Sequence, residues 1–204
     1  MHFFNELFEK SDLPNTGGTR KKFSHMLDEN LYWEIIDASL KNSNNQDTQK
    51  KFLISKLETF NPLDMIGFKL RTDKLLYDTY TSEMWCAGYI MNGGYCSDDG
   101  FEYFRCWIIS RGKDTYYRAK ENPDFLINEL DQTLELYEFE NLWYVAHQTF
   151  ENKTGENMWD FLDPNFDYNE WHYPGLLMNW DSDKPETMAA ICPKLFDKLS
   201  KKNY

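Results

Sequence analysis

The chain has 204 residues, 41% hydrophobic and 17% aromatic, a composition that excludes a disordered polypeptide and predicts a packed core. The formal net charge is −12, and no stretch supplies the roughly 20 apolar residues that a membrane-spanning helix needs. Between residues 121 and 183 there are fifteen acidic residues and one basic residue, Lys153, so phosphates would be repelled and nucleic acid is excluded as a partner.

Residues 1–23 are predicted to form an N-terminal arm and linker, and residues 24–204 a single helical domain. A short amphipathic piece at residues 3–8 is followed by Leu-Pro-Asn-Thr-Gly-Gly, which is typical of a turn and linker. The first residues are acidic and lack a basic region followed by an apolar one, so they do not form a signal peptide. We therefore expect a cytoplasmic location.

Helical periodicity continues along the domain. A first helix is predicted over residues 28–40, and a second, capped by Asp47, ends before Pro62, which opens a third. Further helices are predicted over about 72–90, 99–110, 113–119, from 124 onward, 138–153 and 185–199, the last with a kink or break at Pro193. Because no strand-like alternation of useful length occurs, the fold class is predicted to be all-α.

The signature, as we call residues 91–112, is the densest signal in the chain and reads MNGGYCSDDGFEYFRCWIISRG. Two glycines form a hinge, and Asp98 is the predicted N-cap of the helix over 99–110. That helix is apolar on almost every side, which is typical of a central, enclosed helix, and Gly112 supplies its stop.

The four cysteines are Cys86, Cys96, Cys106 and Cys192, and none belongs to a CxxC pair or lies at a zinc-like spacing from a histidine. Three of them lie in or beside apolar helical runs, where a cysteine behaves as a small hydrophobic residue. We expect reduced thiols, with no metal and no cofactor.

Three stretches together resemble a bacterial domain-of-unknown-function family, number 4240. They are YWEIIDAS at 32–39, WCAGYI at 85–90, and the glycine pair with CSDDGFEYFRCWII at 93–109. The resemblance is continuous over about 28–125 and extends through the helix that ends at Gly155 to residues 192–195. It implies a helical domain with the glycine hinge and the Asp pair at its centre, and it brings no catalytic residue.

Four polar residues of the signature form a candidate site: Asp98, Asp99, Glu102 and Arg105. One interpretation is structural, with Asp98 capping the helix and Arg105 in a buried ion pair that fixes helix packing. The alternative is a small metal-dependent, hydrolase-like enzyme, because paired carboxylates bind divalent cations or share a proton. No third ligand or nucleophile lies at a diagnostic spacing, so we assign no catalytic residue and no metal ligand.

Acidic and aromatic residues alternate between 156 and 183, which makes this segment the candidate docking surface. The predicted partner-binding residues are Asp160, Asp163, Asp167, Glu170, Trp171, Trp180 and Asp181. Rings supply binding area and carboxylates steer a basic partner, although the rings could instead pack the segment onto the helical core.

The pattern predicts a non-enzymatic binding protein, of the kind of the immunity proteins that neutralise a basic toxin or effector. Its expected partner is a basic protein, with neither nucleic acid nor membrane. A scaffold or regulatory module remains open as a third interpretation.

Overall fold

The computed structural model describes residues 21–200, apart from the side chain of Trp171, so the amphipathic piece of the predicted arm lies outside the described residues. The described residues form helices and no strand, which confirms the all-α fold class. The helices are α2 (Glu29–Lys41), α3 (Gln46–Glu58), α4 (Pro62–Asp78), α5 (Ser82–Met91), α6 (Asp98–Ser110), α7 (Lys113–Glu121), η1 (Pro123–Glu129), α8 (Glu140–Thr154), η2 (Met158–Asp160), η3 (Glu170–His172), α9 (Pro185–Ile191) and α10 (Pro193–Leu199).

The helix expected over 72–90 is in fact two helices, so that prediction is wrong. Helix α4 ends at Asp78, and the next residue, Thr79, is its C-cap. The Thr79 hydroxyl donates to the carbonyl groups of Leu75 and Leu76 (3.0 and 3.2 Å). Two residues later Thr81 caps α5 by accepting a hydrogen bond from the N–H of Met84 (3.1 Å). Threonine side chains compete with the helical backbone for hydrogen bonds, and this competition interrupts the helix between α4 and α5.

Helix α6 lies at the centre of the fold, as its apolar sequence predicts. It contacts α2, α4, α5, α7 and α8, and most of its side chains are buried. A Cβ atom on Gly88 of α5 would lie only 3.0 Å from Cδ1 of Phe104. The missing side chain at Gly88 therefore lets α5 approach α6 closely.

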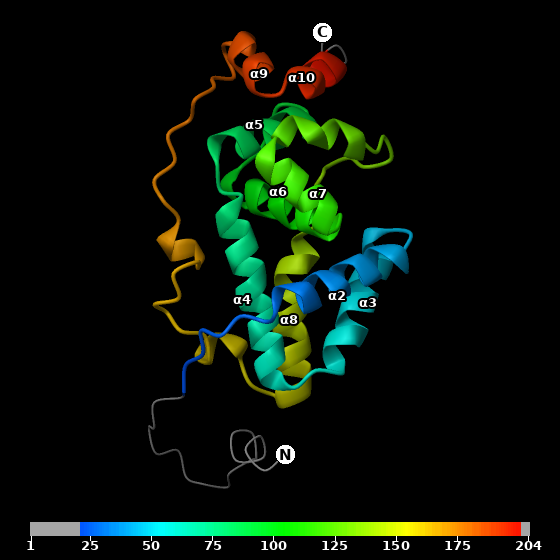
Figure 1. Cartoon of the computed structure of the whole chain (residues 1–204), viewed down its shortest axis with the longest axis vertical. Helices are drawn as coiled ribbons and strands as arrows, with labels where there is room; N and C mark the ends of the chain where they lie inside the picture. Colours follow the sequence, from blue (N-terminus) through cyan, green and yellow to red (C-terminus); the bar gives the residue numbers. More distant parts are fainter. Residues whose placement is uncertain (1–20, 201–204) are drawn as a thin grey trace, which may run out of the picture.

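The helices form two groups, a lower bundle and an upper part that contains α6 (Figure 1). Helices α2, α3, α4 and α8 pack into the lower bundle, in which α8 contacts both α3 and α4. Helices α5, α6 and α7 form the upper part, and α9 and α10 cover its end by packing on α5. The predicted break at Pro193 is confirmed, since α10 begins at that residue.

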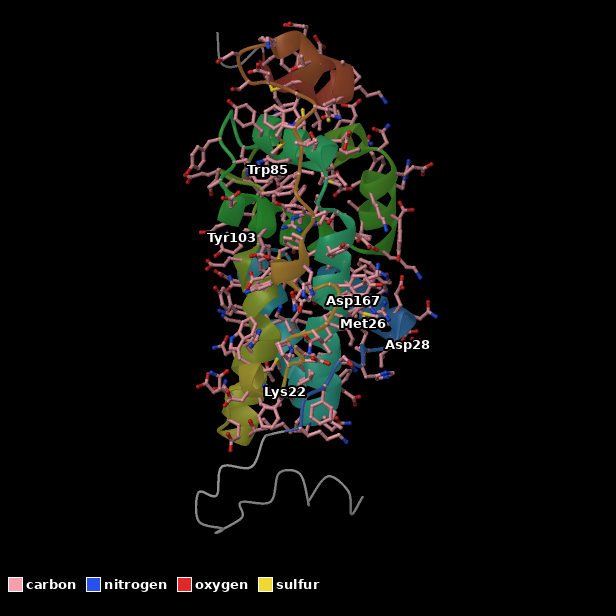
Figure 2. The ribbon with its side chains drawn as sticks, turned by 90° about the vertical axis from the view of Figure 1, so that its left-hand side faces the viewer. Lys22, Met26, Asp28, Trp85, Tyr103 and Asp167 are labelled. Atoms are coloured by element: carbon pink, nitrogen blue, oxygen red, sulfur yellow. The ribbon has the colours of Figure 1, made fainter. Side chains whose placement is uncertain are left out.

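The strap, as we call residues 156–183, runs along one side of the molecule from the end of α8 to α9 (Figures 1 and 2). Near its start it pairs with Phe23, whose N–H donates to the carbonyl of Phe161 (2.8 Å) and whose carbonyl accepts from Asp163 (3.0 Å). Phe161 and Phe166 are buried against the core. The predicted boundary at residue 23 therefore lies where the chain joins the strap.

The four cysteines are free thiols, three of them buried and Cys96 half-buried. Among residues 21–200, no group of three or more His, Cys, Asp or Glu side chains is placed to hold a metal ion. None of the helices in this part of the chain is both long enough and apolar enough to cross a membrane.

Candidate functional site

The candidate site lies at the N-terminal end of α6. Ser97, and not Asp98 as predicted, is the N-cap, because its hydroxyl accepts a hydrogen bond from the N–H of Gly100 (3.1 Å). Asp98 is the first residue of the helix, and it and Asp99 are exposed in the first turn. Both carboxylates are free of the capping bond and lie at the positive end of the helix dipole.

Arg105 is the buried cation of the site and is only 2% exposed. Its Nε donates to the carbonyl of Phe101 (3.3 Å), and its Nη1 donates to the carbonyl of Leu76 (2.6 Å) and the hydroxyl of Tyr173 (3.2 Å). The guanidinium carbon lies 4.5 Å from the ring centroid of Phe101 and 5.1 Å from those of Tyr80 and Tyr173. Among the described residues it forms no salt bridge, so carbonyl groups and rings replace the predicted ion pair.

Glu102, one turn before Arg105, is half-buried, and its Oε1 has no hydrogen-bond partner in the described part of the chain. Burial raises the pKa of the Glu102 carboxyl to about 7, while the charge of Arg105 lowers it and that of Glu170 raises it further. A carboxyl with this pKa exists in both protonation states near neutral pH, so it can donate or accept a hydrogen bond.

The strap completes the site by bringing Glu170 and Tyr173 against α6. The ring of Tyr173 stacks on Tyr80 with the centroids 4.4 Å apart. The resulting cavity, which we call the acidic pocket, has a volume of about 180 Å³. Its charged lining consists of one guanidinium, that of Arg105, and four carboxyl groups, those of Asp98, Asp99, Glu102 and Glu170. Tyr80, Tyr173 and Trp85, the last labelled in Figure 2, are its aromatic walls.

A second pocket of about 180 Å³ shares Glu170 with the acidic pocket. It contains the buried ion pair between Lys69 and Asp73, one turn apart on α4. The Lys69 ammonium group also lies 3.4 Å from the ring centroid of Trp143 on α8. Burial raises the pKa of Asp73, and the neighbouring Lys69 charge lowers it. Each charge of the pair is compensated by the other, so the pair offers no unpaired charge to a ligand. The contact between Lys69 and Trp143 joins α4 to α8.

Two histidines, His147 and His172, are each held by contacts within the domain. His147 stacks on Trp159 (centroids 4.4 Å apart), and burial, followed by the charge of Lys69, lowers its pKa to about 3. It is therefore neutral at physiological pH. A ring nitrogen of His172 is hydrogen-bonded to the carbonyl of Phe166 (2.9 Å), which fixes the strap.

The predicted partner-binding carboxylates differ in their surroundings. Asp160 and Asp167 are exposed to solvent. Asp163 accepts a hydrogen bond from the N–H of Asn165 (2.9 Å), and Asp181 forms an ion pair with Lys184 (3.0 Å). Among the described side chains of the predicted set, only Glu170 lines a pocket together with the acidic residues and the arginine of the signature.

Most aromatic rings of the strap face the core. The indole N–H of Trp180 donates to the carbonyl of Ser82 (2.9 Å), and its ring lies 5.1 Å from that of Tyr89. Trp159 is 48% exposed, but one face stacks on His147. The side chain of Trp171 lies outside the described residues. The rings thus attach the strap to the core, and the exposed carboxylates among the predicted partner-binding residues are those of Asp160 and Asp167.

Sequence reasoning treated the signature and the acidic segment as separate candidates and missed that Glu170 and Tyr173 join them. No local pattern reveals this, because residues 105 and 173 are far apart in the chain. The buried Lys69–Asp73 pair was also missed, although its spacing of four residues within a largely apolar helix is a usable signal.

The fold and the site define an all-α domain with an acidic, aromatic-walled pocket built on its central helix and closed by a strap. Residues 27–152 match the family described as "Protein of unknown function (DUF4240)", and this match covers more than half of the chain. The chain therefore belongs to the DUF4240 family. The match does not include residues 192–195, to which the sequence resemblance was extended. Comparison with curated proteins finds no match, and comparison with solved structures finds none.

Proposed function

We propose that this protein is a non-enzymatic binding protein whose acidic pocket receives a basic side chain of a protein partner. The observation that carries the proposal is the convergence of Asp98, Asp99, Glu102 and Glu170 on one pocket. Arg105, the only cation in the lining, is already held by carbonyl groups and rings. The lining is therefore net negative, and an incoming lysine or arginine supplies the missing positive charge.

The aromatic walls support the same class of ligand. A cation over the face of a tyrosine or tryptophan ring is attracted by its quadrupole, and desolvation strengthens this attraction. Asp160 and Asp167, exposed on the strap, extend the negative field beyond the pocket and would steer a basic protein toward it.

The particular form that we propose is an immunity-type protein of the bacterial cytoplasm, which neutralises a basic toxin or effector by covering it. Asp163 and Asp181, which also lie on the strap, complete the proposed surface. Its support is the charge pattern of the strap together with the acidic pocket.

The pocket is tested with N-acetyl-arginine amide, and with N-acetyl-citrulline amide as the uncharged control of the same shape. The arginine probe is expected to shift the NMR resonance of the indole N–H of Trp85, a residue that lines the pocket, whereas the citrulline probe leaves it unchanged. Replacing Asp98 and Asp99 by Asn should weaken binding by about tenfold, since each exposed charge contributes about 0.5–1 kcal/mol. Asp114→Asn, at an exposed acid on α7, is the matched control. Equal binding of both probes would contradict the proposal.

The docking surface is tested separately with a basic partner purified as a complex from the native cell. Reversing the charge at Asp160, Asp163 and Asp167 to Lys should slow association about tenfold at low salt, with less effect at high salt. Unchanged association kinetics would show that the strap is not part of the interface. The result for the acidic pocket would not be affected.

One observation favours the hydrolase-like alternative: the pKa of Glu102 is about 7, which suits a general acid or base. Under this alternative, hydrolysis of p-nitrophenyl esters or phosphates by the purified protein would be lost in Glu102→Gln and kept in Asp114→Asn. Equal hydrolysis by both variants would assign the activity to a contaminant or another site.

A further inference from the structure

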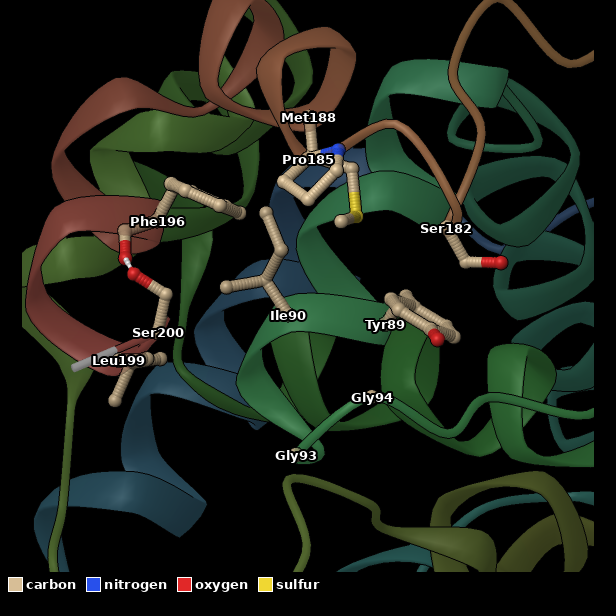
Figure 3. Close-up of a pocket in the computed structure, with 10 residues that line it drawn as sticks. All are labelled: Tyr89, Ile90, Gly93, Gly94, Ser182, Pro185, Met188, Phe196, Leu199 and Ser200. Carbon is tan, nitrogen blue, oxygen red and sulfur yellow. Dashed lines mark hydrogen bonds between the residues drawn. The ribbon is translucent and has the colours of Figure 1, made fainter. Parts of the chain in front are cut away.

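The glycine pair of the signature borders a pocket that the proposed function does not use. This pocket has a volume of about 330 Å³ and lies between the C-terminal end of α5 and the helices α9 and α10 (Figure 3). One wall comes from the matched family region, through Tyr89, Ile90 and the glycines. The other comes from residues 182–200, beyond that region.

The lining of this pocket, which we call the C-terminal pocket, carries no charged side chain among the described residues. The acidic pocket and the pocket at Lys69 are both lined by charged groups. The apolar part of the C-terminal pocket is formed by Ile90, Pro185, Met188, Phe196 and Leu199. Charged residues make up 27% of the chain, so an uncharged lining distinguishes this pocket from the other two and favours an uncharged ligand.

Two hydroxyl groups give the C-terminal pocket a polar side. Tyr89 and Ser182 both line it, toward the right of Figure 3, and neither hydroxyl has a hydrogen-bond partner within residues 21–200. The third hydroxyl, that of Ser200, is occupied because it donates to the carbonyl of Phe196 (2.5 Å). The pocket therefore presents apolar surface together with two hydroxyl groups that can each donate or accept a hydrogen bond.

The glycine pair explains the shape of this side. Gly93 and Gly94 have φ values of +72° and +91°, which side-chain-bearing residues rarely adopt. The N–H of Gly94 donates to the carbonyl of Tyr89 (2.9 Å), so this turn closes α5 directly below the tyrosine. A Cβ atom on Gly94 would lie 3.7 Å from the Tyr89 hydroxyl oxygen. The bare backbone thus leaves space beside that hydroxyl group.

We propose that the C-terminal pocket binds an uncharged, mainly apolar small molecule that carries one hydrogen-bonding group. The apolar part of such a ligand packs on Ile90, Met188 and Phe196, and its polar group bonds to the Tyr89 hydroxyl. A charged ligand would lose its hydration here and find no counter-charge among the described residues of the lining. The volume lies at the lower end of the range of small-molecule sites.

The test uses four probes that share one ring: benzyl alcohol, toluene, benzylammonium and benzoate. Binding to the full chain is followed by NMR through the methyl resonances of Ile90 and Met188, which report on this pocket and not on the acidic one. Benzyl alcohol is expected to bind saturably, and both charged probes at least about tenfold more weakly.

Tyr89→Phe tests the hydrogen bond without changing the shape of the side chain. This substitution should weaken the binding of benzyl alcohol about fivefold and leave the binding of toluene unchanged, because toluene makes no hydrogen bond. Tyr144→Phe, at an exposed tyrosine on α8, is the matched control and should change neither. The proposal is overturned if benzyl alcohol shows no saturable shift of these methyl groups, if benzylammonium or benzoate binds as tightly, or if Tyr89→Phe weakens both neutral probes equally.

Discussion

Glu102 and Arg105 are one turn apart on α6 and do not form a salt bridge, and their surroundings explain why. The Arg105 guanidinium reaches the last turn of α4 and donates to the carbonyl of Leu76, which also accepts hydrogen bonds from the N–H and the hydroxyl of Thr79 (both 3.2 Å). Glu102 loses water without gaining a donor for Oε1. One residue is thus satisfied by the fold, while the other carries a pKa far above the ordinary value for a glutamate.

This raised pKa predicts a pH-dependent stability. The folded-state pKa of Glu102 is about 7 against an ordinary value of 4.5, so the native protein binds this proton more tightly than the unfolded chain does. The free energy of unfolding should therefore fall as pH rises from about 4.5 through 7, by up to about 3 kcal/mol, because each pH unit of pKa difference corresponds to about 1.4 kcal/mol.

Glu102→Gln mimics the protonated carboxyl group and isolates this effect. In urea unfolding at pH 5, 6, 7 and 8, the stability of the variant relative to the natural protein should rise with pH. Asp114→Asn, at an exposed acid, should show a constant difference. A constant difference for Glu102→Gln as well would mean that Glu102 titrates normally.

At the scale of helices, side-chain capping marks where α3, α5 and α6 begin. Ser97, Thr81 and Asn45 cap α6, α5 and α3 respectively, in each case by accepting a hydrogen bond from a first-turn N–H group. The sequence predicted Asp98 as the cap of α6 and Asp47 as the cap of α3, but Ser97 and Asn45, whose backbones are extended, hold these positions. Between α4 and α5 the threonines at 79 and 81 ended a helical pattern that hydrophobic periodicity alone would continue.

Thr81→Ala tests whether this cap supports the break between α4 and α5. Loss of the hydrogen bond to the N–H of Met84 should lower the free energy of unfolding by about 1 kcal/mol, measured by urea denaturation. Thr81→Ser keeps the hydroxyl oxygen and should retain most of the stability. If serine and alanine destabilise the protein equally, the cap is not the source of the effect.

At the scale of the whole molecule, the strap is attached by rings and displays charges. Phe161, Phe166, Tyr173 and Trp180 pack against the helices, and this packing places Glu170 beside the signature. The strap crosses both the lower and the upper parts of the molecule (Figure 1). The position of the acidic pocket therefore depends on contacts made by residues outside it.

Phe166→Ala should loosen the strap and lower the free energy of unfolding by about 3 kcal/mol, because it leaves a cavity in place of the buried Phe166 ring. Hydrogen exchange followed by mass spectrometry should show faster exchange over residues 161–173, with α9 much less affected. Leu177→Ala, at a strap residue that is 91% exposed, is the control and should change stability by less than about 0.5 kcal/mol. Similar exchange in both variants would show that Phe166 does not anchor the strap.

Much of the fold could be predicted from residues close together in the chain. Apolar spacing located most of the helices, and the apolar character of 99–110 placed α6 at the centre. The break at 79–81 was missed because competing hydrogen bonds of threonine side chains leave no trace in hydrophobic periodicity.

The sequence by itself determined the all-α class, the central helix and membership of the DUF4240 family, since these depend on local spacing and on one continuous motif. Only the tertiary structure decided that the rings of the strap face inward and that Glu170 meets the signature. The same sequence pattern of alternating acidic and aromatic residues is compatible with rings that bind a partner and with rings that pack on the chain's own core. Only the packing between distant segments distinguishes the two.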